Sequence, residues 1–268
     1  MQLYGGNMET QTTTQSISQE QPKAGHTFLA SLGKTRLRPG GVEASDWLIN
    51  NGHFTSSSYV LEIACNMATT SIEIAQKYGC HIIAIDMDEK ALANAQRNVE
   101  NAKLSHLIQL TKANALSLPF PDNSFDVVLN EAMLTMYADK AKAKLVKEYY
   151  RVLKPGGLLL THDIMKKNND VDKDNLIGVV KSNVAPMFKQ EWHDLFINIG
   201  FSEVKIKSGN MSLMSPTGLI RDEGLLRTAK IIKNGLKNKQ NRERFLSMFR
   251  FFRKNRHHLN YIACCSKK

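Results

Sequence analysis

Short apolar runs alternate with helical patterns along most of the chain. The apolar runs cover 59–64, 80–86, 107–112, 125–130 and 158–163, and the helical patterns cover 71–78, 89–101, 140–153 and 189–199. This alternation predicts βαβ units, in which helices connect parallel strands and cover both faces of one sheet. The runs are continuously apolar, as at Ile82-Ile83-Ala84-Ile85, which is typical of strands buried on both faces.

Two more strand patterns, 203–207 and 259–265, close the sequence. The 209–257 segment between them is too long for a plain loop in a compact domain. Apolar residues recur in it at helical spacing. These residues are Leu225, Ala229, Ile232 and Leu236, followed by Phe245, Met248, Phe249 and Phe252. We therefore expect a helical insertion, over about 209–257, before the last strand.

The first 25 residues differ in composition from the rest of the chain. They are rich in Gln, Thr and Ser and carry few apolar side chains, so they cannot bury enough surface to offset the entropy of ordering. We expect a disordered tail over 1–25 and one domain over 26–268.

A turn signal at 37–41 precedes a helical pattern at 42–49. The polar 166–187 stretch is interpreted as a loop beside the pocket.

The positive charge is concentrated near the C-terminus. The chain has 36 Lys and Arg against 25 Asp and Glu, and residues 217–268 alone hold fourteen basic and three acidic residues, which is the whole net charge of +11. Three uses of this segment stay open. It can form a lid whose cations face an anionic substrate, a membrane-surface helix that presents Phe249 and Phe252 to lipid, or a packed insertion with a solvated cationic face.

Composition excludes other classes of protein. No apolar run approaches the roughly 20 residues that a membrane-spanning helix needs, and the N-terminal residues lack the basic and apolar regions of a secretory signal. We expect a cytoplasmic protein. The four cysteines show no metal-pair or disulfide spacing, so we expect reduced, buried thiols and no metal site.

Candidate chemistry lies at the carboxyl ends of the strands, where open α/β sheets bind their ligands. Asp86 closes the second strand pattern, and a carboxylate there suits the two hydroxyls of a ribose. Glu62 lies inside the first strand, where a buried carboxylate needs donors or a cation. A ligand ammonium would provide both.

Several sequence motifs together resemble the class I S-adenosylmethionine-dependent methyltransferases, particularly the ubiquinone and menaquinone methyltransferase branch. The motifs are VLEIACNMAT at 60–69, Asp86, NALSLPF at 114–120, FDVV at 125–128 and EYYRVLKPGG at 148–157. The resemblance covers about residues 38 to 208. It implies an α/β fold with a Rossmann-like, seven-stranded, mostly parallel sheet whose last strand is antiparallel, and it implies S-adenosyl-L-methionine as cofactor.

The resemblance also assigns roles to residues. It places Glu62 near the methionine ammonium, Asp86 at the ribose hydroxyls, Asn114 and Ala115 beside the adenine, and Asn130 with Glu131 on the floor near the methyl group. The full expected cofactor set is Arg38, Gly41, Glu62, Ala64, Cys65, Asn66, Thr69, Asp86, Met87, Asn114, Ala115 and Asn130. Candidates for accepting a proton from the substrate are Glu131, His162 and Asp163, all predicted at strand ends.

The first loop departs from the pattern of the family, which is an acidic residue followed by three alternating glycines. Here the three glycine positions hold Ala64, Asn66 and Ala68. Glycine is favoured where φ is positive or the backbone approaches a ligand, and asparagine is the residue that best tolerates the left-handed region otherwise. We expect a stiffer and narrower loop than usual.

We interpret the chain as a methyltransferase that acts on a small molecule, either anionic or lipophilic. A nicotinamide dehydrogenase would need G-x-G-x-x-G after the first strand, which is absent. A methyltransferase for RNA or another nucleic acid is one alternative because of the basic segment, but Asn130-Glu131-Ala132-Met133 lacks the Pro-Pro signature of base methylation. A non-catalytic cofactor-binding relative is the other alternative.

Overall fold

A computed structural model describes residues 24–171, 173–180 and 183–268. The expected tail falls almost wholly on 1–23, which lie outside the described residues. Helix α1 (Gly25–Ser31) begins at the last residue of the expected tail. Within the described ranges, no helix has both the length and the apolar character needed to cross a bilayer.

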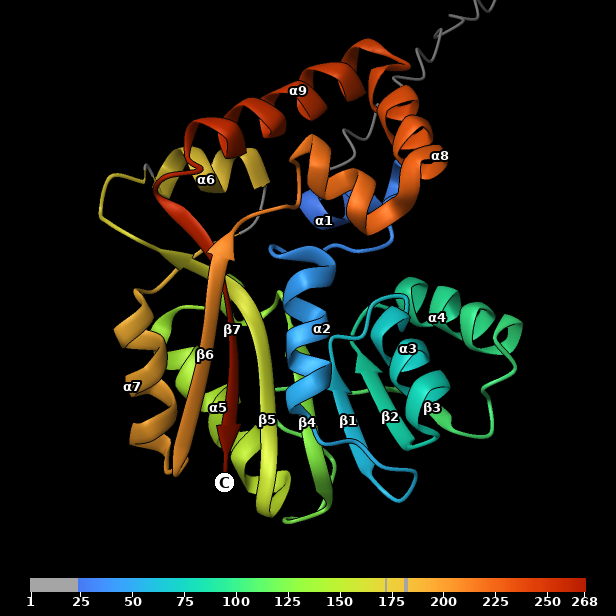
Figure 1. The fold of residues 1–268 in the computed structure, drawn as a ribbon, viewed down its shortest axis with the longest axis vertical. Coiled ribbons are helices and arrows are strands. Elements are labelled where there is room, and N and C mark those ends of the chain that lie inside the picture. Colours follow the sequence, from blue (N-terminus) through green and yellow to red (C-terminus); the bar gives the residue numbers. More distant parts are fainter. Residues whose placement is uncertain (1–23, 172, 181–182) are drawn as a thin grey trace, which may run out of the picture.

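One seven-stranded sheet forms the centre of the molecule (Figure 1). Its strands are β1 (Tyr59–Ile63), β2 (His81–Asp86), β3 (Ile108–Lys112), β4 (Phe125–Glu131), β5 (Leu153–Lys166), β6 (Glu203–Asn210) and β7 (Leu259–Lys267). The order is β3-β2-β1-β4-β5-β7-β6, and only β7 runs antiparallel to its neighbours. The predicted mostly parallel sheet with an antiparallel last strand is confirmed.

Helices cover both faces of the sheet because successive strand residues point to opposite sides. The helices on one face are α2 (Gly41–Asn51), α3 (Thr69–Tyr78) and α4 (Glu89–Asn101), and those on the other are α5 (Asp139–Val152) and α7 (Lys189–Ile199). On the first face Val60 and Ile82 pack with Leu48 of α2. On the second face Leu61 and Val128 pack with α5 and α7. The four cysteines are free and buried.

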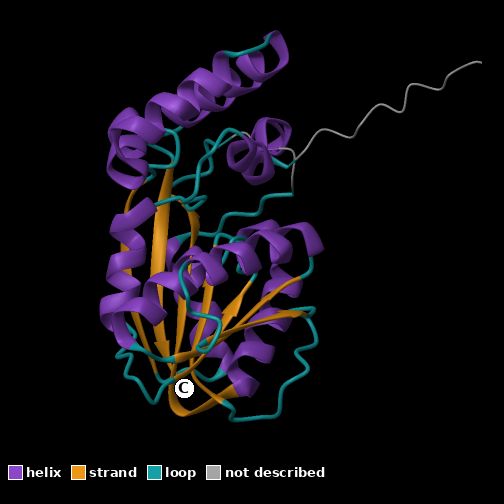
Figure 2. Cartoon of the chain, turned by 90° about the vertical axis from the view of Figure 1, so that its right-hand side faces the viewer, coloured by secondary structure: helices purple, strands orange, loops and turns teal. Residues whose placement is uncertain are grey.

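A helical cap stands beyond the carboxyl ends of the parallel strands, at the top of Figure 1 and Figure 2. It consists of α1, α6 (Lys173–Val180), α8 (Pro216–Leu236) and α9 (Lys239–Lys254). Phe28 and Leu29 of α1 pack with Ile231 of α8 and Phe245 of α9. The predicted helical insertion before the last strand is therefore present, as α8 and α9.

Reading 166–187 as a loop was wrong in part, because this stretch contains α6. The helix is held by tertiary packing. Leu176 is fully buried against Phe251 and Leu259, and the polar residues on either side hid this short apolar pattern in the sequence.

Candidate functional site

A cavity of about 500 Å³ opens at the carboxyl ends of β1, β2 and β4. The sequence-predicted residues that line it are Arg38, Glu62, Ala64, Cys65, Asn66, Thr69, Asp86 and Glu131. Helix α1 contributes a further wall. The sheet and the cap thus enclose the site between them.

The loop after β1 adopts a left-handed backbone at each position where the family has glycine. The φ angles are 54° at Ala64, 50° at Asn66 and 55° at Ala68. A non-glycine residue in this region costs roughly 1–2 kcal/mol, with asparagine the better tolerated. The loop keeps the expected backbone path although all three glycines are replaced.

Asp86 holds this loop from the end of β2. Its Oδ2 accepts a hydrogen bond from the Asn66 backbone N–H at 2.9 Å, and its Oδ1 accepts one from the Asp88 N–H at 2.9 Å. Asp88, not Asp86, is the N-cap of α4, because its side chain accepts from the backbone of Lys90. The Asp86 carboxylate therefore lies in the cavity wall without serving as that helix cap.

Glu62 presents a buried carboxyl group to the same cavity. Its Oε2 accepts hydrogen bonds from the Ser71 backbone N–H, at 3.1 Å, and from the Ser71 hydroxyl. Burial raises the pKa of Glu62 to about 7, against the lowering effects of Ser71 and of the Arg38 charge. Part of the carboxyl population is therefore neutral near pH 7.

Glu131, at the end of β4, is the centre of a buried polar network. Its carboxylate lies 3.0 Å from the Arg38 Nε and accepts hydrogen bonds from the Ser45 and Thr70 hydroxyls, each at 2.8 Å. The His162 Nδ1 is 3.1 Å away. Burial alone would raise the pKa of Glu131, but the Arg38 charge and the His162 hydrogen bond outweigh it and hold the pKa at about 2.

His162 is fully buried behind Glu131. Its Nε2 accepts a hydrogen bond from the Gly40 backbone N–H at 2.9 Å, so the proton of the neutral ring is on Nδ1, facing Glu131. Both ring nitrogens therefore have partners within the protein. His162 does not line the cavity.

Asn130 and Asp163 lie on the other face of the sheet from Glu131 and His162, because side chains alternate along β4 and β5. Both are buried, and among the described residues Asn130 Oδ1 and Asp163 Oδ2 have no hydrogen-bond partner. Burial raises the pKa of Asp163. Neither side chain lines the cavity.

Two acidic residues of α8 fix the segment that carries Arg38. Glu223 is buried and accepts hydrogen bonds from the Thr35 and Arg36 backbone N–H groups, each at 2.9 Å. Asp222 accepts from the Val42 N–H at 3.1 Å, at the start of α2. The cap is thereby tied to the residues that hold Glu131.

The remaining predicted residues do not line the cavity. Gly41 starts α2 with a φ of 57°, and a Cβ there would collide with Asp222. Met87 is largely exposed. Asn114 caps its own turn by accepting from the Leu116 N–H, and Ala115 is buried beside it.

Sequence reasoning missed the cap side of the cavity. The residues concerned are His26, Thr27, Ala30, Ser31 and Leu37 from α1 and the segment after it, together with Met133 and Met136 after β4. Burial is the main influence on His26, and it lowers the pKa of this histidine. The seven residues of α1 carry too short a pattern to mark a ligand wall.

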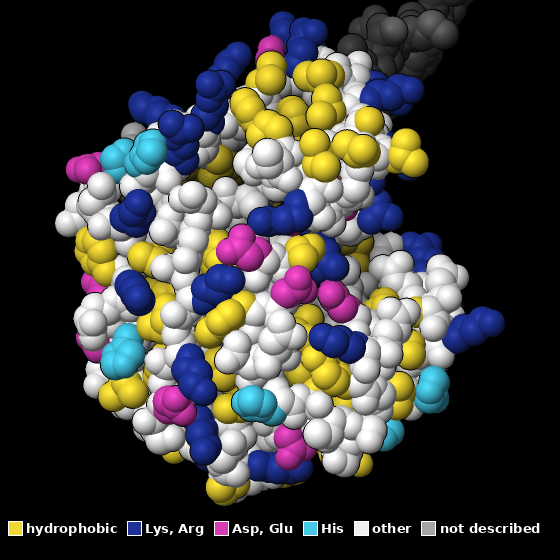
Figure 3. Space-filling model, viewed as in Figure 1, with side chains coloured by type: hydrophobic (Ala, Val, Ile, Leu, Met, Phe, Trp, Pro, Cys, Tyr) yellow, Lys and Arg dark blue, Asp and Glu magenta, His cyan; other side chains and the backbone are white. Residues whose placement is uncertain are grey.

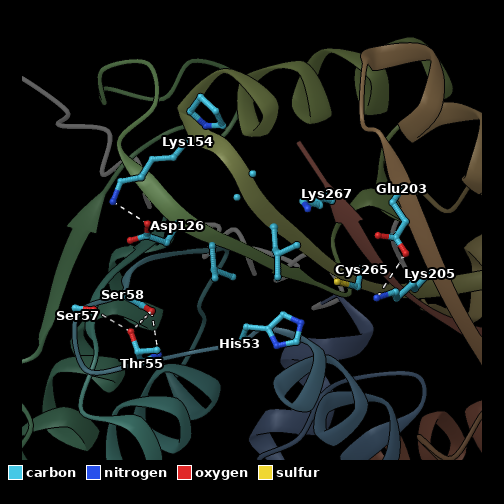
Figure 4. Close-up of a pocket in the computed structure, with 16 residues that line it drawn as sticks. His53, Thr55, Ser57, Ser58, Asp126, Lys154, Glu203, Lys205, Cys265 and Lys267 are labelled. Carbon is cyan, nitrogen blue, oxygen red and sulfur yellow. Dashed lines mark hydrogen bonds and ion pairs between the residues drawn. The ribbon is translucent and has the colours of Figure 1, made fainter.

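A second cavity, of about 510 Å³, lies at the opposite, amino-terminal edge of the sheet (Figure 4). Four of its charged side chains form two ion pairs, Lys154 with Asp126 at 2.8 Å and Lys205 with Glu203 at 3.5 Å. None of the strand-end residues described above lines it. The candidate site is therefore the cavity beneath the cap.

The strand order, the antiparallel β7 and the cavity at the carboxyl ends of β1 and β2 define the class: a Rossmann-like methyltransferase fold. A family described as "Methyltransferase domain" matches residues 60–157. An uncharacterized protein of Haemophilus influenzae is 52% identical over 248 residues, which cover 92% of this chain and 98% of that protein. Residues 60–157 therefore carry this methyltransferase domain, as the sequence resemblance predicted, and the chain belongs to one family with the Haemophilus influenzae protein.

More distant relatives agree with this assignment. A demethylmenaquinone methyltransferase of Listeria welshimeri is 39% identical over 111 residues, which cover 41% of this chain. The match spans only 46% of that enzyme. The structure of an S-adenosylmethionine-dependent methyltransferase from Geobacter sulfurreducens, in complex with S-adenosylhomocysteine, has a TM-score of 0.69 at 15% identity and covers 90% of this chain and 96% of its own. This last similarity is one of fold.

Proposed function

We propose that the protein transfers a methyl group from S-adenosylmethionine to a small-molecule acceptor with an apolar body. The observation that carries this proposal is the lining of the cavity beneath the cap. Its cap side includes the apolar side chains of Ala30, Leu37, Met133 and Met136, beside the polar His26, Thr27 and Ser31. Its volume lies within the range of about 300–1,000 Å³ that is usual for small-molecule sites.

The position of the basic residues argues against an extended anionic acceptor. None of the fourteen Lys and Arg residues of 217–268 lines the cavity. Two basic residues do line it: Arg38, which is already paired with Glu131, and the exposed Lys90 at the start of α4. An RNA methyltransferase would need cations leading to the site, so RNA is the less favoured acceptor. The demethylmenaquinone methyltransferase of Listeria welshimeri suggests quinol-like compounds as the first acceptors to test.

The residues of the cavity fit the cofactor. Glu62 has a buried carboxyl group whose ionised form gains from a nearby ammonium, and Asp86 keeps an accessible carboxylate for the ribose hydroxyls. The Ala64–Ala68 backbone curves past both residues. When bound, the cofactor supplies an electrophilic methyl group.

The chain contributes orientation and water exclusion to the reaction. Arg38, Ser45, Thr70 and His162 hold the Glu131 carboxylate in one position and keep it ionised. A carboxylate with a pKa of about 2 is a weak base. We therefore assign Glu131 a positioning and electrostatic role on the cavity floor, and we assign His162 the role of supporting it.

The proposal is tested by incubating the protein with S-adenosylmethionine and either short-chain naphthohydroquinones and phenols or a pool of RNA. We expect S-adenosylhomocysteine to accumulate together with a methylated small molecule, detected by mass spectrometry. A reaction without acceptor corrects for cofactor breakdown. Methylated RNA without any methylated small molecule would contradict the proposal.

The pKa of Glu62 predicts that cofactor affinity depends on pH. Raising the pH from 5.5 to 7 converts a mostly neutral Glu62 to one that is about half ionised, so the affinity for S-adenosylmethionine should rise about tenfold. Calorimetric titration at several pH values measures this. The Glu62→Gln variant should bind more weakly at pH 7 and lose the pH dependence, and an unchanged slope would show that another group titrates.

A further inference from the structure

The second half of α8 has an apolar stripe that no part of the described chain covers. Leu225, Ala229, Ile232 and Leu236 follow helical spacing, and all four are exposed. Leu225 is 71% exposed and the adjacent Leu226 is 91% exposed. Figure 3 shows hydrophobic side chains gathered over the part of the cap where Figure 1 places α8. We call this surface, Leu225, Leu226, Ala229, Ile232 and Leu236, the α8 stripe.

The α8 stripe is not the packing face of its helix. The packing face consists of Thr228, Ile231 and Gly235, which are buried. Gly235 lies so close to the Phe245 ring that a Cβ there would be 2.8 Å from it. The helix thus has two apolar faces. One is packed within the cap, and the other points outward.

A backbone kink separates the stripe from the part of α8 that holds the active-site segment. Gly224 interrupts the helix with φ 75° and ψ 164°. Asp222 and Glu223, just before it, point inward to the 35–42 segment, and Leu225 and Leu226, just after it, are exposed. The first turns of α8 serve the site, and the later turns form a surface.

Positive charge surrounds the α8 stripe. No acidic residue occurs between Glu223 and Glu243, whereas six basic residues do: Arg227, Lys230, Lys233, Lys237, Lys239 and Arg242. All six are exposed. At 100° per residue, Lys230, Lys233 and Lys237 form a row along one edge of the stripe. The exposed Arg250, Arg253 and Lys254 extend the positive surface onto α9.

Apolar side chains beside a row of lysines on one helix are typical of helices that lie in the interface of an anionic membrane. The leucines would enter the headgroup region, and each lysine near the surface adds electrostatic attraction to anionic lipid. Nucleic acid matches the lysines but not the exposed leucines, and a second copy of this chain matches the leucines but not the like charges around them. The residues therefore fit a lipid surface best.

We propose that the α8 stripe and its lysine row bind the surface of a membrane that contains anionic lipid, without crossing it. This membrane-binding surface differs from the one that the sequence suggested, in which Phe249 and Phe252 face the lipid. Phe249 and Phe252 are half-buried and line a cavity between α8 and α9. The lipid-facing residues are instead those of α8, which packs on α1 through Ile231 and through the Asn234 hydrogen bond to the Leu32 carbonyl. Membrane contact would thus occur next to a helix that walls the active-site cavity.

The test is cosedimentation of the full-length protein with vesicles of phosphatidylcholine alone and of phosphatidylcholine with phosphatidylglycerol. We expect binding to the mixed vesicles only, and weaker binding at high salt. L225S/L226S and K230Q/K233Q/K237Q should each bind at least about tenfold more weakly. Thermal unfolding checks that both variants fold.

Matched controls come from other helices. Ile197→Ser removes a partly exposed apolar side chain from α7, and K140Q/K144Q/K147Q removes three exposed lysines from α5. Both controls should bind vesicles as the unchanged protein does. No binding to the mixed vesicles, or equal losses in controls and α8 variants, would overturn the proposal.

Two other results would also overturn it. Without vesicles, sedimentation equilibrium could show a dimer that L225S/L226S dissociates, which would make a second copy the occupant of the stripe. Binding to RNA that needs the lysines but not the leucines, without vesicle binding, would make nucleic acid the partner. None of these measurements depends on the methyl acceptor, so the outcome is independent of the proposed function.

Discussion

Replacing Glu131 by alanine should lower the free energy of unfolding by about 3–5 kcal/mol. The variant leaves the Arg38 guanidinium buried without its counter-charge, and it removes the acceptor of the Ser45, Thr70 and His162 hydrogen bonds. Breaking one side of a buried ion pair is more costly than removing both. Urea unfolding at pH 7 measures the loss.

The double variant R38M/E131L is the informative control. It removes both charges and keeps apolar volume, so it should recover a substantial part of the stability lost in Glu131→Ala. If the free energy of unfolding of Glu131→Ala were within about 1 kcal/mol of that of the unchanged protein, the Arg38–Glu131 pair would contribute little to stability.

The Arg38–Glu131 pair also makes the stability of the fold depend on pH. The folded-state pKa of Glu131, about 2, lies below its ordinary value of 4.5. Its stabilisation is therefore complete above pH 4.5 and is lost as the pH falls toward 2. This part of the acid dependence should be absent in the double variant.

Replacing Asp86 by alanine should weaken S-adenosylmethionine binding by about a hundredfold, because two charged hydrogen bonds to the ribose are each worth roughly 1.5–3 kcal/mol and are only partly replaced by water. The variant also removes the acceptor of the Asn66 N–H, which shapes the loop after β1. Calorimetric titration with S-adenosylmethionine and S-adenosylhomocysteine gives the two dissociation constants.

Glu89→Ala is the matched control for Asp86, since it removes a nearby exposed carboxylate that pairs with Lys112. Its affinity should stay within about twofold of the unchanged protein, because an exposed ion pair contributes little. Equal affinity of Asp86→Ala and the unchanged protein would show that the ribose does not lie at the end of β2.

The strand and helix pattern of the sheet was predictable because it is local. Alternating apolar runs and helical spacing are visible within each βαβ unit, and α4 and α7 have the predicted bounds. Helices α1 and α6 were not predicted, since they depend on distant partners. Leu29 packs against Ile231, and Leu176 packs against Phe251.

The site was predictable on its sheet side only. Glu62, Asp86 and Glu131 follow or end strands, so their place at one edge of a parallel sheet follows from topology. The tie between Glu223 and Thr35 joins residues 188 positions apart, and no local pattern links them. The cap wall of the cavity has the same long-range origin.

In the loop after β1, residues other than glycine adopt the positive φ that glycine usually adopts. Ala64, Asn66 and Ala68 all have φ near 50–55°, so the fold requires this angle and does not require glycine itself. A substitution by glycine at these positions should therefore keep the fold. A substitution by valine or isoleucine should disrupt the loop, because the branched Cβ disfavours positive φ. A search for relatives that scores these three positions by their conformation would include chains of this kind, which a pattern written in glycines passes over.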